Sequence, residues 1–481
     1  MPDRARLLST TSDGWRGVLG DNLTFITLSR LADAIAEVAL ADSSSPSVFL
    51  GYDTRFMGRH LALALADSLS IGGVTTLLSR TPLATPILSW YLRNAPTPFT
   101  LGMMITASHN PPWYNGVKLR LADGGPPAGS VVNDINSVYR ACRRQWSTRA
   151  RAPLAYVEPD VRQEYVRALR AEIDLAEIDR TIPAIATDPM HGATSGLLPD
   201  LLAGTRVRIH EVRAALDPKF GGAAPEPTPA SVTPLIDVVR SFDCWAGFAH
   251  DGDGDRIVGA DAARGFVPAE DLALVLARQR VLDGVRGAIV GTAASTSRMR
   301  RAADLWGVPW RQVPTGFWHA SDLMRTEEVL VASEQNGGIA LGGHLPERDG
   351  ILAAARLVDL MARRRMPLGA LLDEVDAALP PVASLRKDYE RQRFPPSYDF
   401  DHLLPKPPAT LGGVRVRIIE RSDGVKLTLE DESWVLVRAA RTEPLIRLYA
   451  EAASVAEAEA RITAVADKLL TPEVTRDGEA R

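Results

Sequence analysis

The chain has 481 residues, of which 46% are hydrophobic and 24% are charged. This length predicts several globular domains, about three or four at roughly 100–150 residues each. The formal net charge of −4, from 55 basic and 59 acidic residues, argues against nucleic acid or a membrane surface as a general partner.

No apolar segment typical of a signal peptide follows the first residues, and no uncharged apolar run is long enough to span a membrane. The two cysteines, Cys142 and Cys244, form no CxxC pair, so we expect both to be reduced and structural. A cytoplasmic enzyme fits these features, and we expect a monomer or a homodimer.

The first segment of the chain alternates strand and helix patterns. Short apolar runs at 48–51, 74–78 and 101–106 predict buried strands, and residues 60–70 have helical spacing without a breaker. This alternation predicts βαβ units and a mainly parallel sheet. Ligands bind at the carboxyl ends of strands in such sheets, and Ser108 follows directly after one of them.

The second and third segments continue the same pattern. We predict a strand at 183–187, and the second segment closes at residues 247–250, which lead into an acidic loop. The proline-rich run at 225–229 favours a surface loop or an ordered turn. A third segment begins near residue 264, with a helix at 269–280 and a strand at 287–291.

Proline pairs at 380–381 and 395–396 bracket a predicted linker into a last small domain. That domain is predicted to contain strands at 413–419, 425–429 and 434–437 and a helix at 455–470. An arginine-rich stretch at 143–151 indicates the first boundary. We therefore predict αβ domains at 1–152, 153–263 and 264–379, and a smaller α+β domain at 380–481.

Residues 106–111 read Thr-Ala-Ser-His-Asn-Pro. A serine with a histidine beside it and Lys118 further along is a candidate activated nucleophile. His109 and Lys118 are candidates for moving a proton. The alternatives are that His109 only orients the loop and that Lys118 is a solvated surface lysine.

Asp251, Asp253 and Asp255 alternate with two glycines. Such a loop can fold around one ion, because glycine permits positive φ and close approach, and oxygen ligands favour Mg²⁺. A calcium EF-hand is excluded, since Arg256 and Ala262 stand where it requires Gly and Glu. An acidic surface turn is the alternative, but three adjacent carboxylates repel one another without a cation.

The acidic loop and Ser108 together predict phosphoryl transfer. Arg256 can balance the carboxylates and reach a phosphate, and the remaining coordination position would accept an oxygen atom supplied by Ser108.

These motifs occur with others in a recognisable order. They are 12–17 (Ser-Asp-Gly-Trp-Arg-Gly), 51–55 (Gly-Tyr-Asp-Thr-Arg), 106–111, 220–222 with 225–227, 251–256, 334–337 (Glu-Gln-Asn-Gly), 342–350 and 438–449. Together they resemble the α-D-phosphohexomutases, the family of phosphoglucomutases and phosphomannomutases, along nearly the whole chain, and those at 342–350 and 220–227 resemble the phosphoglucomutase branch.

The resemblance implies a fold of four domains around a deep central cleft: three similar αβ domains with mixed sheets and a smaller, mobile α+β C-terminal domain. It implies that phosphate moves between the C1 and C6 (or equivalent) positions of a hexose phosphate through phosphorylated Ser108 and a bisphosphorylated sugar. It implies Mg²⁺ as cofactor and a sugar bisphosphate as activator. The implied catalytic residues are Ser108, His109, Lys118, Arg16 and Arg256, and the implied metal ligands are Ser108, Asp251, Asp253 and Asp255. The implied sugar-binding residues are Glu334, Asn336, Thr315 and Gly316, and the implied phosphate-binding residues are Arg438, Arg441, Thr442 and Arg447.

The sequence departs from the family pattern on the sugar side. Ala440-Arg441 stands in place of Ser-Gly, Asn336 in place of serine, and Trp318-His319 where a lysine is expected. The loss of a hydroxyl at Ala440 would cost on the order of 1–3 kcal/mol if a phosphate oxygen went unpaired. Trp318 could line the sugar site or pack in the core.

We therefore predict a mutase with shifted sugar specificity. The alternatives are a hydrolase that uses the same phosphoserine and a non-catalytic protein that binds sugar phosphates.

Overall fold

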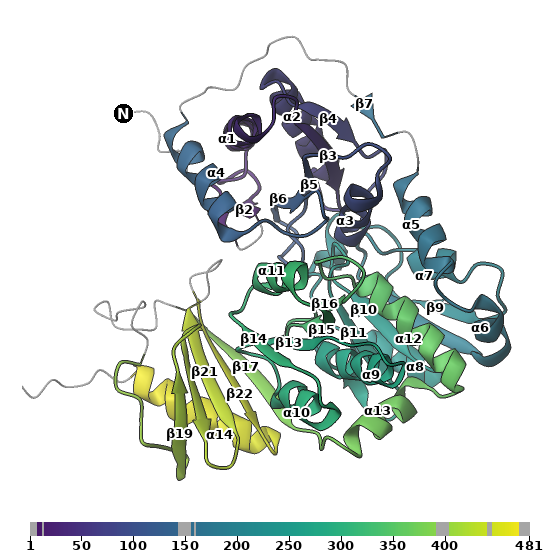
Figure 1. Cartoon of the computed structure of the whole chain (residues 1–481), viewed down its shortest axis with the longest axis vertical. Coiled ribbons are helices and arrows are strands. Elements are labelled where there is room, and N and C mark those ends of the chain that lie inside the picture. Colours follow the sequence, from purple (N-terminus) through teal and green to yellow (C-terminus); the bar gives the residue numbers. More distant parts are fainter. Residues whose placement is uncertain are drawn as a thin grey trace, which may run out of the picture.

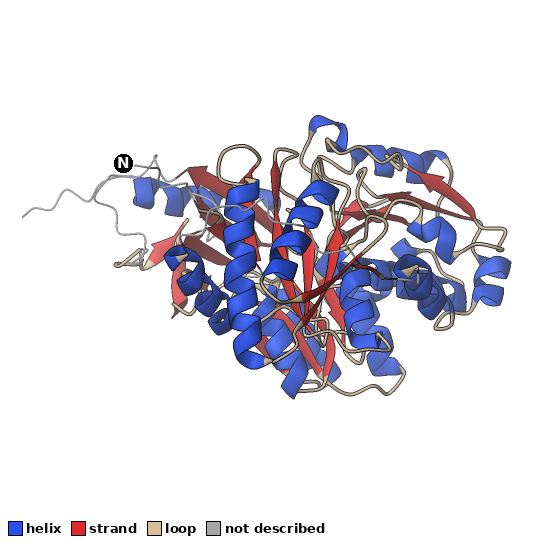
Figure 2. Cartoon of the chain, turned by 90° about the horizontal axis from the view of Figure 1, so that it is seen from above, coloured by secondary structure: helices blue, strands red, loops and turns tan. Residues whose placement is uncertain are grey.

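The computed structural model describes residues 7–11, 14–142, 155–157, 160–390, 404–439 and 445–470. The chain forms three αβ domains and a smaller C-terminal domain with one helix on an antiparallel sheet (Figure 1). In the view from above, helices flank the strands of the sheets (Figure 2). The predicted α/β class is confirmed. The predicted boundary at 143–151 and the proline pair at 395–396 lie outside the described residues.

The first sheet has the order β1-β2-β6-β5-β3-β4-β7. Its strands are β1 (Ser9–Thr10), β2 (Gly14–Val18), β3 (Ser47–Tyr52), β4 (Thr75–Leu78), β5 (Leu101–Ile105), β6 (Tyr114–Leu121) and β7 (Ala155–Tyr156). Its helices are α1 (Phe25–Asp42), α2 (Gly58–Ile71), α3 (Thr85–Asn94) and α4 (Gly129–Ala141).

The sheet is mixed, as the family resemblance implies, whereas the mainly parallel sheet expected from the strand–helix alternation holds for only half of it. Strands β5, β3, β4 and β7 are parallel, whereas β6 pairs antiparallel with both β5 and β2. Strand β6 runs back because only the short serine loop joins it to β5, which leaves no room for a crossover helix. Because β7 pairs with β4, the first sheet extends a few residues past the predicted boundary at 152.

The second sheet has the order β12-β11-β10-β8-β9 and is also mixed. Its strands are β8 (Ala184–Asp188), β9 (Arg208–Glu211), β10 (Gly247–His250), β11 (Ile257–Asp261) and β12 (Gly265–Val267). Its helices are α5 (Val161–Arg170), α6 (Leu175–Thr181), α7 (Leu197–Leu201), α8 (Thr233–Ser241) and the short 3₁₀ turn Phe220–Gly222. The acidic loop connects β10 to its antiparallel neighbour β11.

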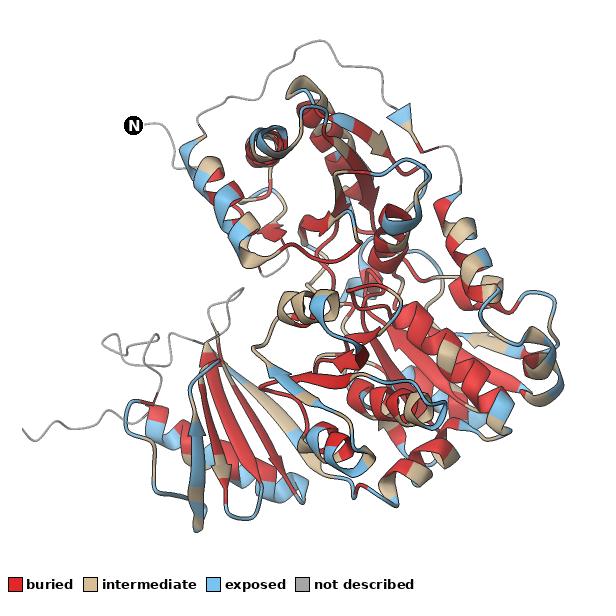
Figure 3. Cartoon of the chain, viewed as in Figure 1, coloured by how far each residue is buried: buried red, intermediate tan, exposed pale blue. Residues whose placement is uncertain are grey.

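The third sheet has the order β14-β13-β15-β16. Its strands are β13 (Ala288–Thr292), β14 (Trp310–Val313), β15 (Val329–Ser333) and β16 (Ile339–Leu341). Its helices are α9 (Ala269–Leu282), α10 (Ser297–Trp306), α11 (Phe317–Thr326), α12 (Gly350–Arg364) and α13 (Leu368–Asp376). One buried cluster includes Phe49, Phe248 and Ile289, so the cores of the first three domains are continuous (Figure 3).

The C-terminal sheet has the order β17-β22-β21-β20-β19-β18. Its strands are β17 (Ala383–Glu390), β18 (Thr410–Leu411), β19 (Val414–Glu420), β20 (Val425–Leu429), β21 (Trp434–Ala439) and β22 (Leu445–Ala452), and α14 (Val455–Leu470) packs on it. The predicted linker between the proline pairs is wrong for residues 383–390, because β17 pairs with β22 along its whole length. The strand lies at the edge of the sheet, where flanking prolines are tolerated.

Within the described part of the chain, no helix combines the length and apolarity needed to cross a membrane.

Candidate active site

The serine loop begins where β5 ends, and Ser108 occupies a left-handed backbone conformation with φ of 52°. Its backbone N–H donates to Thr106 Oγ1 at 2.9 Å. Its hydroxyl donates to Asp251 Oδ2 at 2.6 Å across 143 residues of sequence. A strained φ at a non-glycine residue costs about 1–3 kcal/mol and persists only where the surroundings impose it, which is consistent with a functional position.

Arg55 stabilises the backbone conformation of the serine loop by hydrogen bonds to its carbonyl oxygens. Its buried guanidinium donates to the carbonyl oxygens of Ser108, Asn110, Pro111 and Tyr114. Asp53 in turn lies 3.3 Å from Arg55 Nε and accepts the hydroxyl of Thr106 at 2.5 Å. Burial raises the pKa of Asp53 to about 6, although Arg55 opposes this shift.

The acidic loop comes into direct contact with the serine loop. A Cβ atom on Gly252 would lie 2.7 Å from the carbonyl oxygen of Ser108, and Gly254 has φ of 75°. Both glycines therefore have a physical reason to be glycine. Asp251, Asp253 and Asp255 are completely buried, so the surface-turn alternative is wrong.

The three carboxylates form a group suited to a cation. One oxygen atom from each lies within 4.8 Å of the others, and the buried Oδ1 atoms of Asp253 and Asp255 have no hydrogen-bond donor. Unpaired buried carboxylate oxygens are costly without a ligand. An all-oxygen donor set of this kind fits Mg²⁺.

Basic side chains already neutralise part of this charge. Lys118 Nζ lies 2.6 Å from Asp253 Oδ2 and 2.5 Å from Asp255 Oδ2, and Arg348 Nη2 lies 2.8 Å from Asp255 Oδ2. Lys118 is 1% exposed, so the reading of a solvated surface lysine is wrong. Burial and the two neighbouring carboxylates raise the pKa of Asp251 to about 8. Although burial opposes it, Arg348 and Lys118 hold the pKa of Asp255 below its ordinary value.

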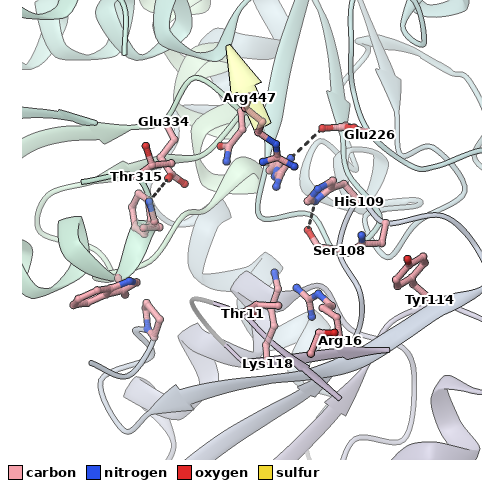
Figure 4. Close-up of a pocket in the computed structure, with 18 of the residues that line it drawn as sticks. Thr11, Arg16, Ser108, His109, Tyr114, Lys118, Glu226, Thr315, Glu334 and Arg447 are labelled. Atoms are coloured by element: carbon pink, nitrogen blue, oxygen red, sulfur yellow. Dashed lines mark hydrogen bonds and ion pairs between the residues drawn. The ribbon is translucent and has the colours of Figure 1, made fainter. Parts of the chain in front are cut away.

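A cavity of about 380 Å³ opens above these groups, between the four domains. Ser108 and His109 lie on one side, Lys118 and Arg16 below, and Thr315 and Glu334 opposite (Figure 4). The predicted site residues that line it are Arg16, Ser108, His109, Lys118, Arg256, Thr315, Gly316, Glu334, Asn336, Arg438 and Arg447. Arg441, Thr442 and the neighbouring Ala440 lie outside the described residues.

His109 is half-buried beside the nucleophile, with Nδ1 3.4 Å from Ser108 Oγ. Burial, followed by the positive charges of Arg256, Arg16, Arg447 and Arg386, lowers the pKa of His109 well below its ordinary value. The imidazole is therefore neutral at pH 7 and able to accept a proton.

The residues predicted to bind the sugar lie on the third domain and line one side of the cavity. Glu334 accepts the N–H of Gly316 at 3.2 Å and lies 3.5 Å from Arg348. Trp318 is half-buried and lines the cavity, so the core-packing alternative for it is wrong. The centroid of its ring lies 3.5 Å from the centroid of the His319 ring. Aromatic rings thus stand where a lysine was expected.

The C-terminal domain contributes a cluster of arginines. Arg438 on β21 pairs with Asp423 at 3.3 Å, and Asp423 also accepts the N–H of Thr315 at 2.9 Å. Arg447 on β22 lies 3.8 Å from Asp388. Asp423 therefore connects Arg438, which is predicted to bind phosphate, to Thr315 of the loop that is predicted to bind the sugar.

Sequence reasoning did not assign a role to several residues at the site. Arg348 lies inside the motif at 342–350 and could have been singled out there. Arg55 likewise belongs to the motif at 51–55, but its role depends on carbonyl groups that only the fold brings together. Arg386, Tyr449 and Glu226 also line the cavity, and Arg386 was missed because its strand was interpreted as a linker.

Comparison with known families agrees with this geometry. Four domain models named phosphoglucomutase/phosphomannomutase match the chain in order: α/β/α domains I, II and III at residues 8–145, 163–265 and 269–378, and the C-terminal domain at 405–468. A protein of Methanothermobacter thermautotrophicus named "Probable phosphoglucosamine mutase" is 30% identical over 93% of this chain and 94% of its own length. The chain belongs to the α-D-phosphohexomutase family.

Other relatives of this phosphohexomutase carry different sugar names. A phosphoglucomutase/phosphomannomutase of Thermococcus kodakarensis is 27% identical, with 92% of this chain and 94% of that protein covered. The crystal structure of a candidate phosphomannomutase from Thermus thermophilus superposes with a TM-score of 0.84 at 30% identity, covering 97% of this chain and 99% of that one. The chain is therefore a phosphosugar mutase by family, with a buried acidic metal site.

Proposed function

We propose that this phosphohexomutase moves phosphate between the C1 and C6 positions of a hexose phosphate through a phosphoserine at Ser108. The observation that carries the proposal is the contact of Ser108 Oγ with Asp251 Oδ2 at 2.6 Å, in a cavity lined by arginines from all four domains. The nucleophile, the acidic trio and the cationic groups are thus arranged around one space, as phosphoryl transfer requires.

In the proposed reaction, phosphorylated Ser108 gives its phosphoryl group to a free hydroxyl of the sugar phosphate. The bond from phosphorus to the serine oxygen breaks, a bond to the sugar oxygen forms, and the hydroxyl proton passes to a protein base. The bisphosphorylated sugar then turns around, and its other phosphate returns to Ser108. Mg²⁺ held by Asp251, Asp253, Asp255 and the serine oxygen would neutralise charge that develops on the transferred group.

His109 and Lys118 are the proposed proton carriers. The neutral His109 ring lies beside the serine oxygen and can accept a proton. Lys118 is held by two carboxylates at the same place, where it supplies positive charge and can return a proton. Arg16, whose Nη1 donates to the carbonyl oxygen of Thr106 at 2.8 Å, and Arg256 supply further charge to the transferred phosphate.

We further propose that sugar specificity differs from that of an enzyme for glucose and mannose phosphates alone. Asn336 and Trp318 replace the family's serine and lysine on the sugar side, and both line the cavity. The test is turnover of the 1-phosphates of glucose, mannose, glucosamine, N-acetylglucosamine and ribose, each primed with a sugar bisphosphate. We expect one amino-sugar or uncommon sugar phosphate to be preferred. Equal and high rates with glucose and mannose phosphates would contradict the proposed shift.

Ser108→Ala tests the phosphoserine mechanism. We expect the isomerisation rate to fall by at least about 10³-fold, because only positioning and electrostatic effects remain when a covalent nucleophile is removed. Mass spectrometry should find one phosphate on Ser108 of the wild type and none on the variant. Ser137→Ala, which removes an exposed hydroxyl of α4, should change neither result.

The alternatives have different outcomes in the same assays. A phosphoserine hydrolase would release inorganic phosphate faster than it forms the isomer. A non-catalytic binding protein would bind sugar phosphates without phosphorylation of Ser108 or turnover.

A further inference from the structure

The edge strand β17 brings an arginine to the cavity. In an antiparallel pair, directly opposite residues point to the same face of the sheet. Arg386 lies opposite Tyr449, and Asp388 lies opposite Arg447, which in turn lies opposite Arg438 on β21. These five side chains therefore share the face of the C-terminal sheet that looks into the cavity, and Arg386, Arg438, Arg447 and Tyr449 line it.

Arg386 is oriented by a carboxylate of its own strand. Its Nε and Nη2 atoms donate to the two oxygens of Asp388 at 2.9 and 2.6 Å. Asp388 also lies 3.8 Å from Arg447, so one carboxylate holds two guanidiniums of neighbouring strands side by side. The other edge of the Arg386 guanidinium, at Nη1, faces Glu226 across the cavity.

The carboxylate of Glu226 lies between the guanidiniums of Arg256 and Arg386 without a close contact to either. Its Oε1 atom lies 3.6 Å from Arg256 Nη1 and 3.9 Å from Arg386 Nη1, longer than a hydrogen bond in both cases. Figure 4 shows Glu226 and Arg447 on the same side of the pocket, across from Lys118 and Arg16. The space between Arg256 and Arg386 thus accommodates an anionic oxygen atom. A phosphate oxygen in this space would lie closer to the two guanidiniums than the Glu226 carboxylate does.

A mutase that reacts at Ser108 must hold the phosphate already on its substrate elsewhere in the same cavity, while Ser108 faces the free hydroxyl. Ala440 lacks the hydroxyl that the family places in its phosphate-binding loop. An arginine binds phosphate bidentately through two parallel N–H groups, and Arg386 is already aligned with Arg438 and Arg447.

We propose that Arg386 binds the non-reacting phosphate of the sugar phosphate together with Arg438 and Arg447. This inference rests on the proposed function, since it assumes a phosphorylated sugar in the cavity. It assigns a substrate contact to a strand that the sequence pattern did not suggest. The competing reading is that Arg386 only pairs with Asp388 to stabilise the sheet.

The test is the affinity for glucose 6-phosphate, mannose 6-phosphate and glucosamine 6-phosphate, measured by calorimetry, with unphosphorylated glucose as the reference. We expect Arg386→Ala to weaken binding of the phosphates by about tenfold to a hundredfold, the usual effect of losing a charged hydrogen bond. Binding of glucose should not change. Arg386→Lys should lie between the two, because it keeps the charge and loses the bidentate geometry.

Lys387→Ala is the matched control. Lys387 is the next residue of β17, points to the opposite face and pairs with Glu459 on α14 at 2.6 Å. Its removal should leave affinity for the phosphates unchanged. In turnover, Arg386→Ala should raise KM much more than it lowers kcat, since the contact is made in the ground state and the transition state alike.

The outcomes separate the two proposals. If the wild type bound none of the three hexose phosphates, this inference would be overturned, and absence of turnover with every sugar 1-phosphate named above would overturn the proposed function as well. If the wild type bound them and Arg386→Ala bound them equally well, only the role of Arg386 would be lost. Equal loss of affinity for the phosphates and for glucose would favour a purely structural role of Arg386. So would a lower Tm of Arg386→Ala, if Arg386→Lys fully restored both the Tm and the affinity.

Discussion

At the scale of single residues, the carboxylates of Asp251, Asp253 and Asp255 are partly neutralised by basic groups and partly open to a cation. Lys118 and Arg348 contact the Oδ2 atoms of Asp253 and Asp255, whereas the Oδ1 atoms of both aspartates are buried without a donor. Two basic groups therefore stabilise the trio in the folded chain and still leave oxygen atoms for a cation. The sequence predicted the ligands, but not which oxygens stay open.

Asp253→Asn should weaken Mg²⁺ binding by at least about tenfold, because it removes a charged ligand and places an amide between Lys118 and Thr85. We expect mutase activity to fall and to recover in part at high Mg²⁺, and a chelator to abolish activity of the wild type. Titration calorimetry with Mg²⁺ measures the affinity directly. Asp304→Asn, an exposed position on α10, should bind Mg²⁺ as the wild type does, and unchanged affinity in Asp253→Asn would exclude Asp253 as a ligand.

At the scale of elements, the start of α10 shows how buried carboxylates join two domains. Glu270 on α9 accepts the N–H of Thr296, and Glu451 on β22 of the C-terminal domain accepts the N–H of Ser297 at 3.0 Å. Both satisfy N–H groups that a helix terminus leaves unpaired. Burial raises the pKa of Glu270 to about 8. The N–H and hydroxyl donors lower this pKa, and the nearby carboxylates of Glu451 and Asp271 raise it further.

This pKa predicts a pH dependence of stability. Between the ordinary value of 4.5 and about 8, the folded protein keeps the proton of Glu270 while the unfolded chain loses it. The folded state therefore loses stability from this residue as pH rises through that window. Glu270→Gln mimics the protonated form, so its Tm should gain on that of the wild type steadily from pH 5 to pH 8.

Thermal unfolding at several pH values measures this difference. Glu457→Gln, an exposed position in the first turn of α14, serves as the control and should follow the wild type. A constant difference in Tm between Glu270→Gln and the wild type across the range would show that Glu270 is ionised in the folded protein.

At the scale of the whole molecule, ion pairs connect domains around the cavity. Arg120 on β6 of the first domain meets Glu347 of the third at 2.5 Å, with both side chains fully buried. Arg348 next to it pairs with Asp255 of the second domain. These buried pairs therefore help to set the relative positions of the first three domains, which surround the cavity together with the C-terminal domain.

Arg120→Ala should lower the free energy of unfolding by about 3–5 kcal/mol, because it leaves Glu347 Oε2 buried without its ion-pair partner while Arg348 contacts the other oxygen, Oε1. Replacing both residues, as in Arg120→Met with Glu347→Leu, should cost much less. Denaturant unfolding compares the two. Arg415→Ala breaks an exposed pair with Glu430 at 3.7 Å and should cost only about 0–1 kcal/mol. An equal cost for the single and the double variant would contradict a coupled buried pair.

Much of the chain could be predicted from local pattern. The strand predicted at 425–429 and the helix at 455–470 coincide with β20 and α14, because alternation and helical periodicity act over a few neighbouring residues. Ser108 and the acidic loop were recognisable because their residue types and spacing are unusual without a ligand. The path of β6, the strand β17 and the role of Arg55 were not predictable in this way, since each depends on pairing with distant residues.

By itself, the amino-acid sequence determined the residue types and spacings on which the proposed chemistry rests: the serine beside a histidine, the three alternating aspartates and the arginines near the C-terminus. Only the tertiary structure decided that Ser108 touches Asp251, that Lys118 lies between two carboxylates and that Arg386 faces the same cavity. The physical reason is distance along the chain. Residue type and spacing are local properties, whereas hydrogen bonds, burial and pKa shifts depend on which distant groups the packed domains bring within a few ångströms.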